Sequence, residues 1–223
     1  LVPYSKNLPA EFIEQRFPVT VEKVGLAIDS GGPGKYRGGL GYVKEIRSSV
    51  DAHYTTVTER TAFSPIGIKG GKAGTPGGSI KNPGDLNEEN VFFSRDAVPV
   101  KAGELIRLVT PGGGGWGDPL ERPVDAVRLD VLRKLVSSES AESDYGVVLN
   151  GGDLIVDHKK TKTLREKIAA KRGPIKLIDR GAYAQTLIKK GKISVSEPEL
   201  ESESEADDAV LEYYWKDLYK YSK

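Results

Sequence analysis

Histidine and cysteine, two of the commonest zinc ligands, are scarce or absent in this 223-residue chain. It has two histidines and no cysteine, which excludes disulfides, thiolate metal sites and cysteine nucleophiles. His53 and His158 lie far apart in sequence and lack the paired spacing of a helical zinc site. Neither a Gly-x-Ser-x-Gly elbow nor a His-Glu-x-x-His motif occurs. We therefore assign no catalytic residue and identify no metal site from the sequence.

Three charged residues near glycine-rich turns are candidate binding residues. Arg37 and Arg60 could each hold a carboxylate or phosphate through two parallel hydrogen bonds. Asp29, together with Asp51 and Glu59, could supply carboxylates to a hard-cation site, although their spacing does not require one. Structural ion pairs are the commoner role of such arginines, so the binding and structural interpretations both stay open.

Glycine-rich loops raise the question of a phosphate site, because backbone N–H groups in such loops can cradle anions. Residues 71–73 read Gly-Lys-Ala and residues 34–36 read Gly-Lys-Tyr, and neither ends in the Ser or Thr of a Walker A loop. Residues 112–117 match Gly-x-Gly-x-x-Gly, but Pro119 disfavours the helix that must open there in a dinucleotide site. The loops therefore do not predict an independent nucleotide site.

A structural role for the glycines has its own physical basis. Glycine adopts positive φ and permits close backbone approach, so residues 31–34 and 38–39 could be tight β connections. Ordering a loop as flexible as residues 111–117 costs conformational entropy, which suggests contacts that fix it, for instance at a subunit interface. The candidate substrate or interface positions in these loops are Gly70, Gly71, Gly113, Gly114 and Trp116.

The elements that must position these residues change character along the chain. Twenty of the 26 glycines fall at or before Gly117, and short β-branched runs between turn residues predict a mostly antiparallel β region over residues 17–110. Helical spacing predicts helices at 124–136, 138–144 and 161–172, with Thr161 as an N-cap, and residues 147–156 suggest a small hairpin. The predicted fold class is therefore α+β, with a glycine-rich β region (1–123) followed by a helical region (124–195).

The last part of the sequence is predicted to be a tether. Residues 196–208 are acidic and poor in hydrophobic residues, which is typical of a flexible linker. Residues 209–223 place Val210, Leu211, Tyr214 and Trp215 at helical spacing, which favours an amphipathic helix. That helix could dock on another chain or pack on its own domain.

Composition argues against two classes of partner, nucleic acids and membranes. The net charge of +1 argues against a nucleic-acid interface, and no run approaches the ~20 apolar residues of a membrane span. No charged-then-apolar leader opens the sequence, so we expect a cytoplasmic protein. The sequence begins at Leu1 and contains no methionine, from which we expect a piece or processed subunit that needs an N-terminal companion.

Four segments resemble one family. Residues 17–41 contain DSGGPGKYRGGLG, residues 58–78 contain GGKAGTPGG, residues 110–123 contain PGGGGWGDP, and residues 135–149 end in DYGVVL. In order and spacing they resemble the C-terminal portion of hydantoinase B/oxoprolinase subunits, over roughly residues 10–180. That resemblance implies ATP-dependent chemistry on a ketone, hydantoin or lactam. A hydantoinase A-like subunit would bind ATP with Mg²⁺ and phosphorylate a carbonyl or enol oxygen, while the B-type subunit supports hydrolysis or carboxylation.

The resemblance also implies partners. The expected partners are an N-terminal hydantoinase B-like chain and the hydantoinase A-like subunit, with a divalent metal such as Zn²⁺ or Mn²⁺ held in a partner chain. We expect this chain to be inactive alone and to belong to a hetero-oligomer. A ketone carboxylase is the first choice, a hydantoinase, oxoprolinase or lactamase the alternative, and a non-catalytic structural subunit the third.

Overall fold

The computed structural model describes residues 7–91 and 94–194. The chain divides into two compact units, residues 1–186 and residues 187–223. Only residues 187–194 of the second unit are described, so the fold is that of the first unit. The predicted acidic linker (196–208) and tail helix (209–223) lie outside the described residues.

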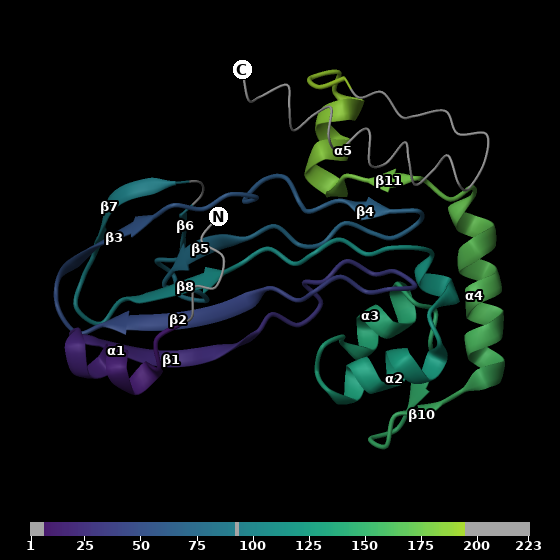
Figure 1. Cartoon of the computed structure of the whole chain (residues 1–223), viewed down its shortest axis with the longest axis horizontal. Helices are drawn as coiled ribbons and strands as arrows, with labels where there is room; N and C mark the ends of the chain where they lie inside the picture. Colours follow the sequence, from purple (N-terminus) through teal and green to yellow (C-terminus); the bar gives the residue numbers. More distant parts are fainter. Residues whose placement is uncertain (1–6, 92–93, 195–223) are drawn as a thin grey trace. The chain divides into compact units, whose positions relative to one another are not determined.

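The main element of the first unit is a five-stranded antiparallel sheet (Figure 1). Its order is β1 (Val19–Leu26), β2 (Tyr42–Ser48), β8 (Leu105–Val109), β5 (Gly78–Lys81) and β6 (Glu89–Val91). All of its pairings are antiparallel, which confirms the predicted β region. Helix α1 (Ala10–Arg16) lies against edge strand β1, where the Glu14 carboxylate accepts a hydrogen bond from the Val21 amide at 2.8 Å.

The two faces of this sheet differ in chemistry, because cross-strand partners project to the same side. On one side Arg107 bonds Glu45 at 2.7 Å, and Arg47 bonds Glu22; we call this the charged face. The opposite side carries mainly aliphatic residues of β1, β2 and β8, and we call it the apolar face. Its members are Val19, Val21, Val24, Leu26, Ile46, Ile106 and Leu108.

A two-stranded ribbon lies over one end of the apolar face. It pairs β3 (Ala52–Thr56) with β7 (Arg95–Val100). The Tyr54 hydroxyl is 2.8 Å from the Ser79 hydroxyl of β5, which ties the ribbon to the sheet. Between ribbon and sheet is a cavity of about 180 Å³ whose lining includes Val19, Ile46 and Ile106.

Apart from α1, the helices follow the strands of the sheet, as predicted for an α+β fold. They are the 3-10 turn η1 (Pro119–Glu121), α2 (Val124–Leu132), α3 (Ser138–Ser143), α4 (His158–Arg172) and α5 (Gly181–Lys189). Short ladders pair β9 (Leu149–Asn150) with β10 (Ile155–Val156), and β4 (Gly67–Ile68) with β11 (Ile178–Asp179). None of the described helices is long and apolar enough to cross a membrane.

One helix prediction needs correction. Helix α4 begins at His158, and its N-cap is Asp157, whose carboxylate accepts from the Lys160 amide at 2.9 Å. Thr161, the predicted cap, is buried inside the helix, where its hydroxyl accepts from the Val148 amide at 3.0 Å. The helix therefore begins one turn earlier than predicted, because Asp157 caps it while the Thr161 hydroxyl is engaged by the Val148 amide. Helices α1 and α5 were not predicted.

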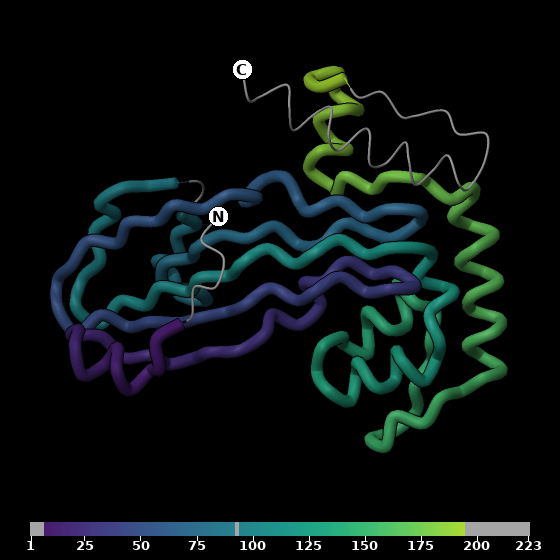
Figure 2. Tube along the Cα trace, viewed as in Figure 1, coloured from purple at the N-terminus to yellow at the C-terminus, as the bar shows by residue number. Residues whose placement is uncertain are grey.

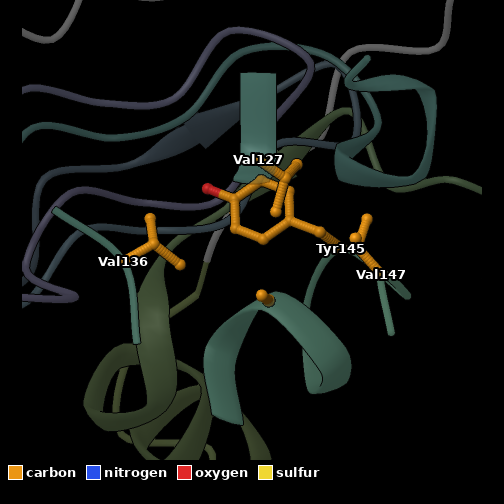
Figure 3. Close-up of a cluster of buried hydrophobic side chains, with 5 residues drawn as sticks. Val127, Val136, Tyr145 and Val147 are labelled. Atoms are coloured by element: carbon orange, nitrogen blue, oxygen red, sulfur yellow. The ribbon is translucent and has the colours of Figure 1, made fainter. Parts of the chain in front are cut away.

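A compact aliphatic core joins α2, α3 and the segment after α3 (Figure 3). Tyr145 is 1% exposed, and its ring lies among Val127, Val136 and Val147. Gly146, with φ of 61°, provides a left-handed turn after α3. This core gives the helical region a fixed frame beside the glycine-rich segments.

Candidate functional site

Three glycine-rich segments run side by side and are hydrogen-bonded through their backbones (Figure 2). We call residues 30–41, 65–75 and 111–117 the glycine bundle. The Gly32 amide donates to the Gly113 carbonyl at 2.8 Å, and the Gly113 amide donates to the Gly39 carbonyl at 2.8 Å. In the same way the Gly115 amide donates to the Lys72 carbonyl at 2.9 Å. Residues 31–34 and 38–39 are therefore parts of a long extended connection, not tight β turns.

Close backbone approach explains why glycine occupies these positions. A Cβ atom at Gly34 would lie 2.7 Å from both the amide nitrogen and the carbonyl oxygen of Trp116. At Gly114 it would lie 2.5 Å from the carbonyl carbon of Ile66 and overlap its oxygen. Real Cβ atoms do not approach backbone so closely. The contacts that fix the loop at residues 111–117 thus come from this chain, where the sequence suggested a subunit interface.

The bundle is anchored to α2 by a buried ion-pair cluster. The Arg37 Nε atom lies 3.2 Å from Asp130 Oδ2, and Arg122 Nη2 lies 2.8 Å from the same oxygen. Arg122 also donates to the Lys35 carbonyl at 2.9 Å. The three side chains are 10–15% exposed, which limits access of a ligand to them. Arg37 therefore has the structural role that the sequence left open.

A second ion pair joins the end of the bundle to α4. Arg172 donates to both carboxylate oxygens of Asp118, at 2.6 and 2.7 Å. Burial alone would raise the pKa of Asp118, but the hydrogen bonds from Arg172 and from the Leu120 amide outweigh it and hold the pKa below its usual value. Lys72 within the bundle pairs with Asp144. Each pair fixes a glycine-rich segment to a helical element.

Two buried polar atoms next to these pairs have no hydrogen-bond partner among the described residues: Arg122 Nε and the Tyr145 hydroxyl. Burial strongly raises the pKa of Tyr145, so its phenol stays neutral. Arg165 approaches from α4 and donates to the Tyr145 carbonyl at 3.0 Å. A neutral, enclosed phenol of this kind is a packing residue with no access to a substrate.

The remaining candidates are spread over several places. Asp29 has φ of 60°, and its carboxylate accepts from the Ser137 amide at 2.8 Å, just before α3. Asp51 is 2.8 Å from Lys101 Nζ. Among residues 7–91 and 94–194 no group of three His, Asp or Glu side chains could hold a metal ion, so the cation site considered for Asp29, Asp51 and Glu59 does not form.

Five loop candidates do come together in the glycine bundle. Gly113 and Gly114 lie in its third segment, as does Trp116, which is 39% exposed and has Lys69 Nζ 5.3 Å from its ring centroid. Gly70 and Gly71 line a cavity of about 190 Å³ whose lining also includes Lys72, Arg172 and Lys176. Arg60 sits outside the bundle on an exposed turn, with φ of 56°.

Sequence reasoning missed Asp118, Arg122, Asp130 and Arg172, the partners that hold the bundle in place. Asp130 carried no signal of burial, because the predicted helix has its Arg and Asp residues on the face opposite its apolar stripe, yet Asp130 is 7% exposed. The arginine that would meet it, 93 residues away in sequence, could not be identified from spacing.

Comparison with known proteins identifies the family that this chain resembles. Residues 1–119 match the family model described as hydantoinase B/oxoprolinase. The B-type subunit of a putative D-/L-hydantoinase from a Pseudomonas species is 32% identical over 73% of this chain and 27% of its own length. The crystal structure of ATP-dependent caprolactamase from Pseudomonas jessenii has a TM-score of 0.62 and 31% identity, over 71% of this chain and 28% of that one.

A nucleotide-free acetone carboxylase structure shares the fold, with a TM-score of 0.57 and 19% identity over 84% of this chain and 29% of that one. The chain thus spans less than a third of each of these relatives. The family model covers more than half of its residues, and the glycine-rich motifs lie largely within that match. This chain belongs to the hydantoinase B/oxoprolinase family.

Proposed function

We propose that this chain is a non-catalytic scaffold within the B-type unit of an ATP-dependent cyclic-amide hydrolase. The proposal rests on the hydrogen bonds that the backbone amides of the glycine bundle already make. Amides that would cradle a phosphate, such as those of Gly32, Gly113 and Gly115, donate to carbonyl oxygens of this chain. Arg37, Arg122 and Arg172 are engaged in ion pairs. These loops are therefore preorganised as a rigid support for catalytic groups that other parts of the enzyme supply.

The relatives favour a cyclic amide as the substrate class. The hydantoinase relative and the caprolactamase, both named for cyclic amides, are 32% and 31% identical to this chain. A ketone carboxylase, the first choice from the sequence, becomes the second candidate, because the acetone carboxylase likeness at 19% identity concerns the fold. The carboxylase is kept because that likeness extends over 84% of this chain, against 71% for the caprolactamase.

Cofactors and partners follow from this assignment. ATP with Mg²⁺ would be bound by a hydantoinase A-like subunit, and an N-terminal hydantoinase B-like chain would complete the B-type unit in a cytoplasmic hetero-oligomer. A divalent metal such as Zn²⁺ or Mn²⁺ would also belong to a partner chain, since the described residues offer no group of three suitable ligands. No step of the reaction is assigned to a side chain of this chain.

The test is to recover a tagged copy of the chain with its partners from its source and to measure ATP consumption. Hydantoin, caprolactam, 5-oxoproline and acetone with bicarbonate are supplied in turn. We expect ATP hydrolysis coupled to opening of a cyclic amide, and the exposed Arg60→Ala variant should match the wild type. Coupling to acetone and bicarbonate alone would favour the second candidate. A tenfold loss of turnover in an intact Arg60→Ala complex would refute the scaffold role.

A further inference from the structure

The five-stranded sheet leaves one end of its apolar face uncovered. At the other end, the ribbon of β3 and β7 covers Ile106, which is only 8% exposed. Toward the end of β1, however, Val24 and Leu26 are 55% and 56% exposed. Ile28, two residues beyond Leu26, is 50% exposed. We call Val24, Leu26 and Ile28 the apolar strip.

The strip continues into the cavity beneath the ribbon. Val24 is the cross-strand partner of Lys44, and Lys44 is in turn the partner of Leu108. Both Lys44 and Leu108 line the cavity of about 180 Å³. Exposed aliphatic side chains on one side of an edge strand and just beyond its end, next to an open apolar cavity, are typical of a surface that another element covers.

We propose that the apolar strip and this cavity dock the remaining part of the hydantoinase B-type unit, which presents aliphatic side chains to them. The inference rests on the proposed function in that the chain works inside such a unit. The chain covers 28% of the caprolactamase polypeptide, so the larger part of that relative lies outside the match and is available as the occupant. An occupant of that size can bury both the strip and the cavity.

The position of the strip favours this occupant over the chain's own tail. All three residues of the strip lie within residues 1–119, the range that the family model matches. Residues 195–223 lie outside that range. A surface within the residues that the family model matches is best explained by a partner common to B-type proteins. The tail lies beyond the matched residues and explains such a surface less well. A second copy of this chain is the other rival.

The variant Val24→Asp/Leu26→Asp tests the proposal. Both residues are more than half exposed, so the substitutions leave the isolated chain folded. Buried in the complex, each carboxylate should weaken binding about tenfold or more, which gives at least ~100-fold for the pair. The matched control is Thr20→Asp/Lys23→Gln. It changes the net charge by the same amount, on the same strand, but on the charged face.

The probe is the hydantoinase B-type polypeptide that copurifies with the tagged chain from its source, identified by its sequence. Its affinity for wild type, variant and control is measured by calorimetry, with circular dichroism to confirm folding. We expect the strip variant to lose at least ~100-fold and the control less than about threefold. Equal affinities for the strip variant and wild type would overturn the proposal, as would failure of any B-type polypeptide to copurify.

Two further measurements separate the rival occupants. Wild-type dimerisation that the strip variant abolishes would assign the surface to a second copy. Increased hydrogen exchange at residues 24–28 after deletion of residues 195–223 would assign it to the tail. Either result overturns the docking proposal. Failure of the proposed function is distinct, because it appears as an assembled complex that couples ATP hydrolysis to none of the supplied substrates.

Discussion

Replacement of Gly114 by alanine tests whether the glycine bundle is a close-packed backbone structure. The new Cβ would lie 2.5 Å from the Ile66 carbonyl carbon, whereas non-bonded carbons rest at about 3.5–4.0 Å. The two segments must therefore separate by roughly 1 Å. Gly39 is the control in the same bundle, since a Cβ there meets nothing within 4 Å.

The cost follows from the bonds that such a separation would break. Next to Gly114, the Ile68 amide donates to the Gly115 carbonyl and the Gly115 amide donates to the Lys72 carbonyl, both at 2.9 Å. Loss of a hydrogen bond that leaves a buried group unsatisfied costs about 1–3 kcal/mol, so two bonds amount to about 2–6 kcal/mol. Domains of this kind have a total stability of about 5–15 kcal/mol. Gly39→Ala should change stability by less than about 1 kcal/mol.

The measurement is urea denaturation of both variants and the wild type, followed by far-ultraviolet circular dichroism and by tryptophan fluorescence, since Trp116 lies in the third segment of the bundle. We expect Gly114→Ala to lower the midpoint strongly and Gly39→Ala to leave it nearly unchanged. If Gly114→Ala lost less than about 1 kcal/mol relative to Gly39→Ala, the segments would not be packed as closely as described.

Three further changes test the ion pairs, the core and a strained turn. Asp118→Asn should destabilise by about 1.5–3 kcal/mol at neutral pH, because it weakens the hydrogen bonds between Arg172 and a charged carboxylate. The pKa of Asp118 is lowered in the fold from its usual 3.8, so its stabilisation is present above that value and is lost as pH falls through the folded pKa. The variant should therefore show a shallower acid decline of unfolding free energy; a parallel decline would contradict this. Tyr145→Phe should be neutral or stabilise by up to about 1 kcal/mol in thermal melts, because no described residue bonds its hydroxyl. A larger loss would mean that the hydroxyl has a partner. Arg60→Gly should be about 1 kcal/mol more stable than Arg60→Ala, given its φ of 56°, and equal melting temperatures would argue against that strain.

The α+β class and most elements were predictable because they depend on local patterns. Short β-branched runs between glycines became strands β1, β2 and β8, and the apolar spacing from Val124 became α2. Helix boundaries were less certain, as α4 shows: Asp157 and Thr161 are both suitable cap residues, and tertiary packing buried Thr161. Helices α1 and α5 were not predicted from the sequence.

The candidate residues were only partly predictable, because their partners come from distant parts of the chain. Arg37 was recognised as a residue that needs an anion, yet the sequence could not show whether that anion is a ligand or Asp130. The same limit applies to Asp118 and Arg172, which are 54 residues apart. Ion pairs across such separations form only when packing has already brought the elements together.

The sequence by itself determined the family, the fold class and the absence of cysteine chemistry, since motif order and composition are properties of the chain alone. It also showed where glycine is concentrated. Only the tertiary structure decided what the glycines do. Whether an amide meets a phosphate or a neighbouring carbonyl depends on which segments lie side by side. Here Gly32, Gly113 and Gly115 face backbone of their own chain, because three segments without Cβ atoms can approach closely enough to hydrogen-bond directly.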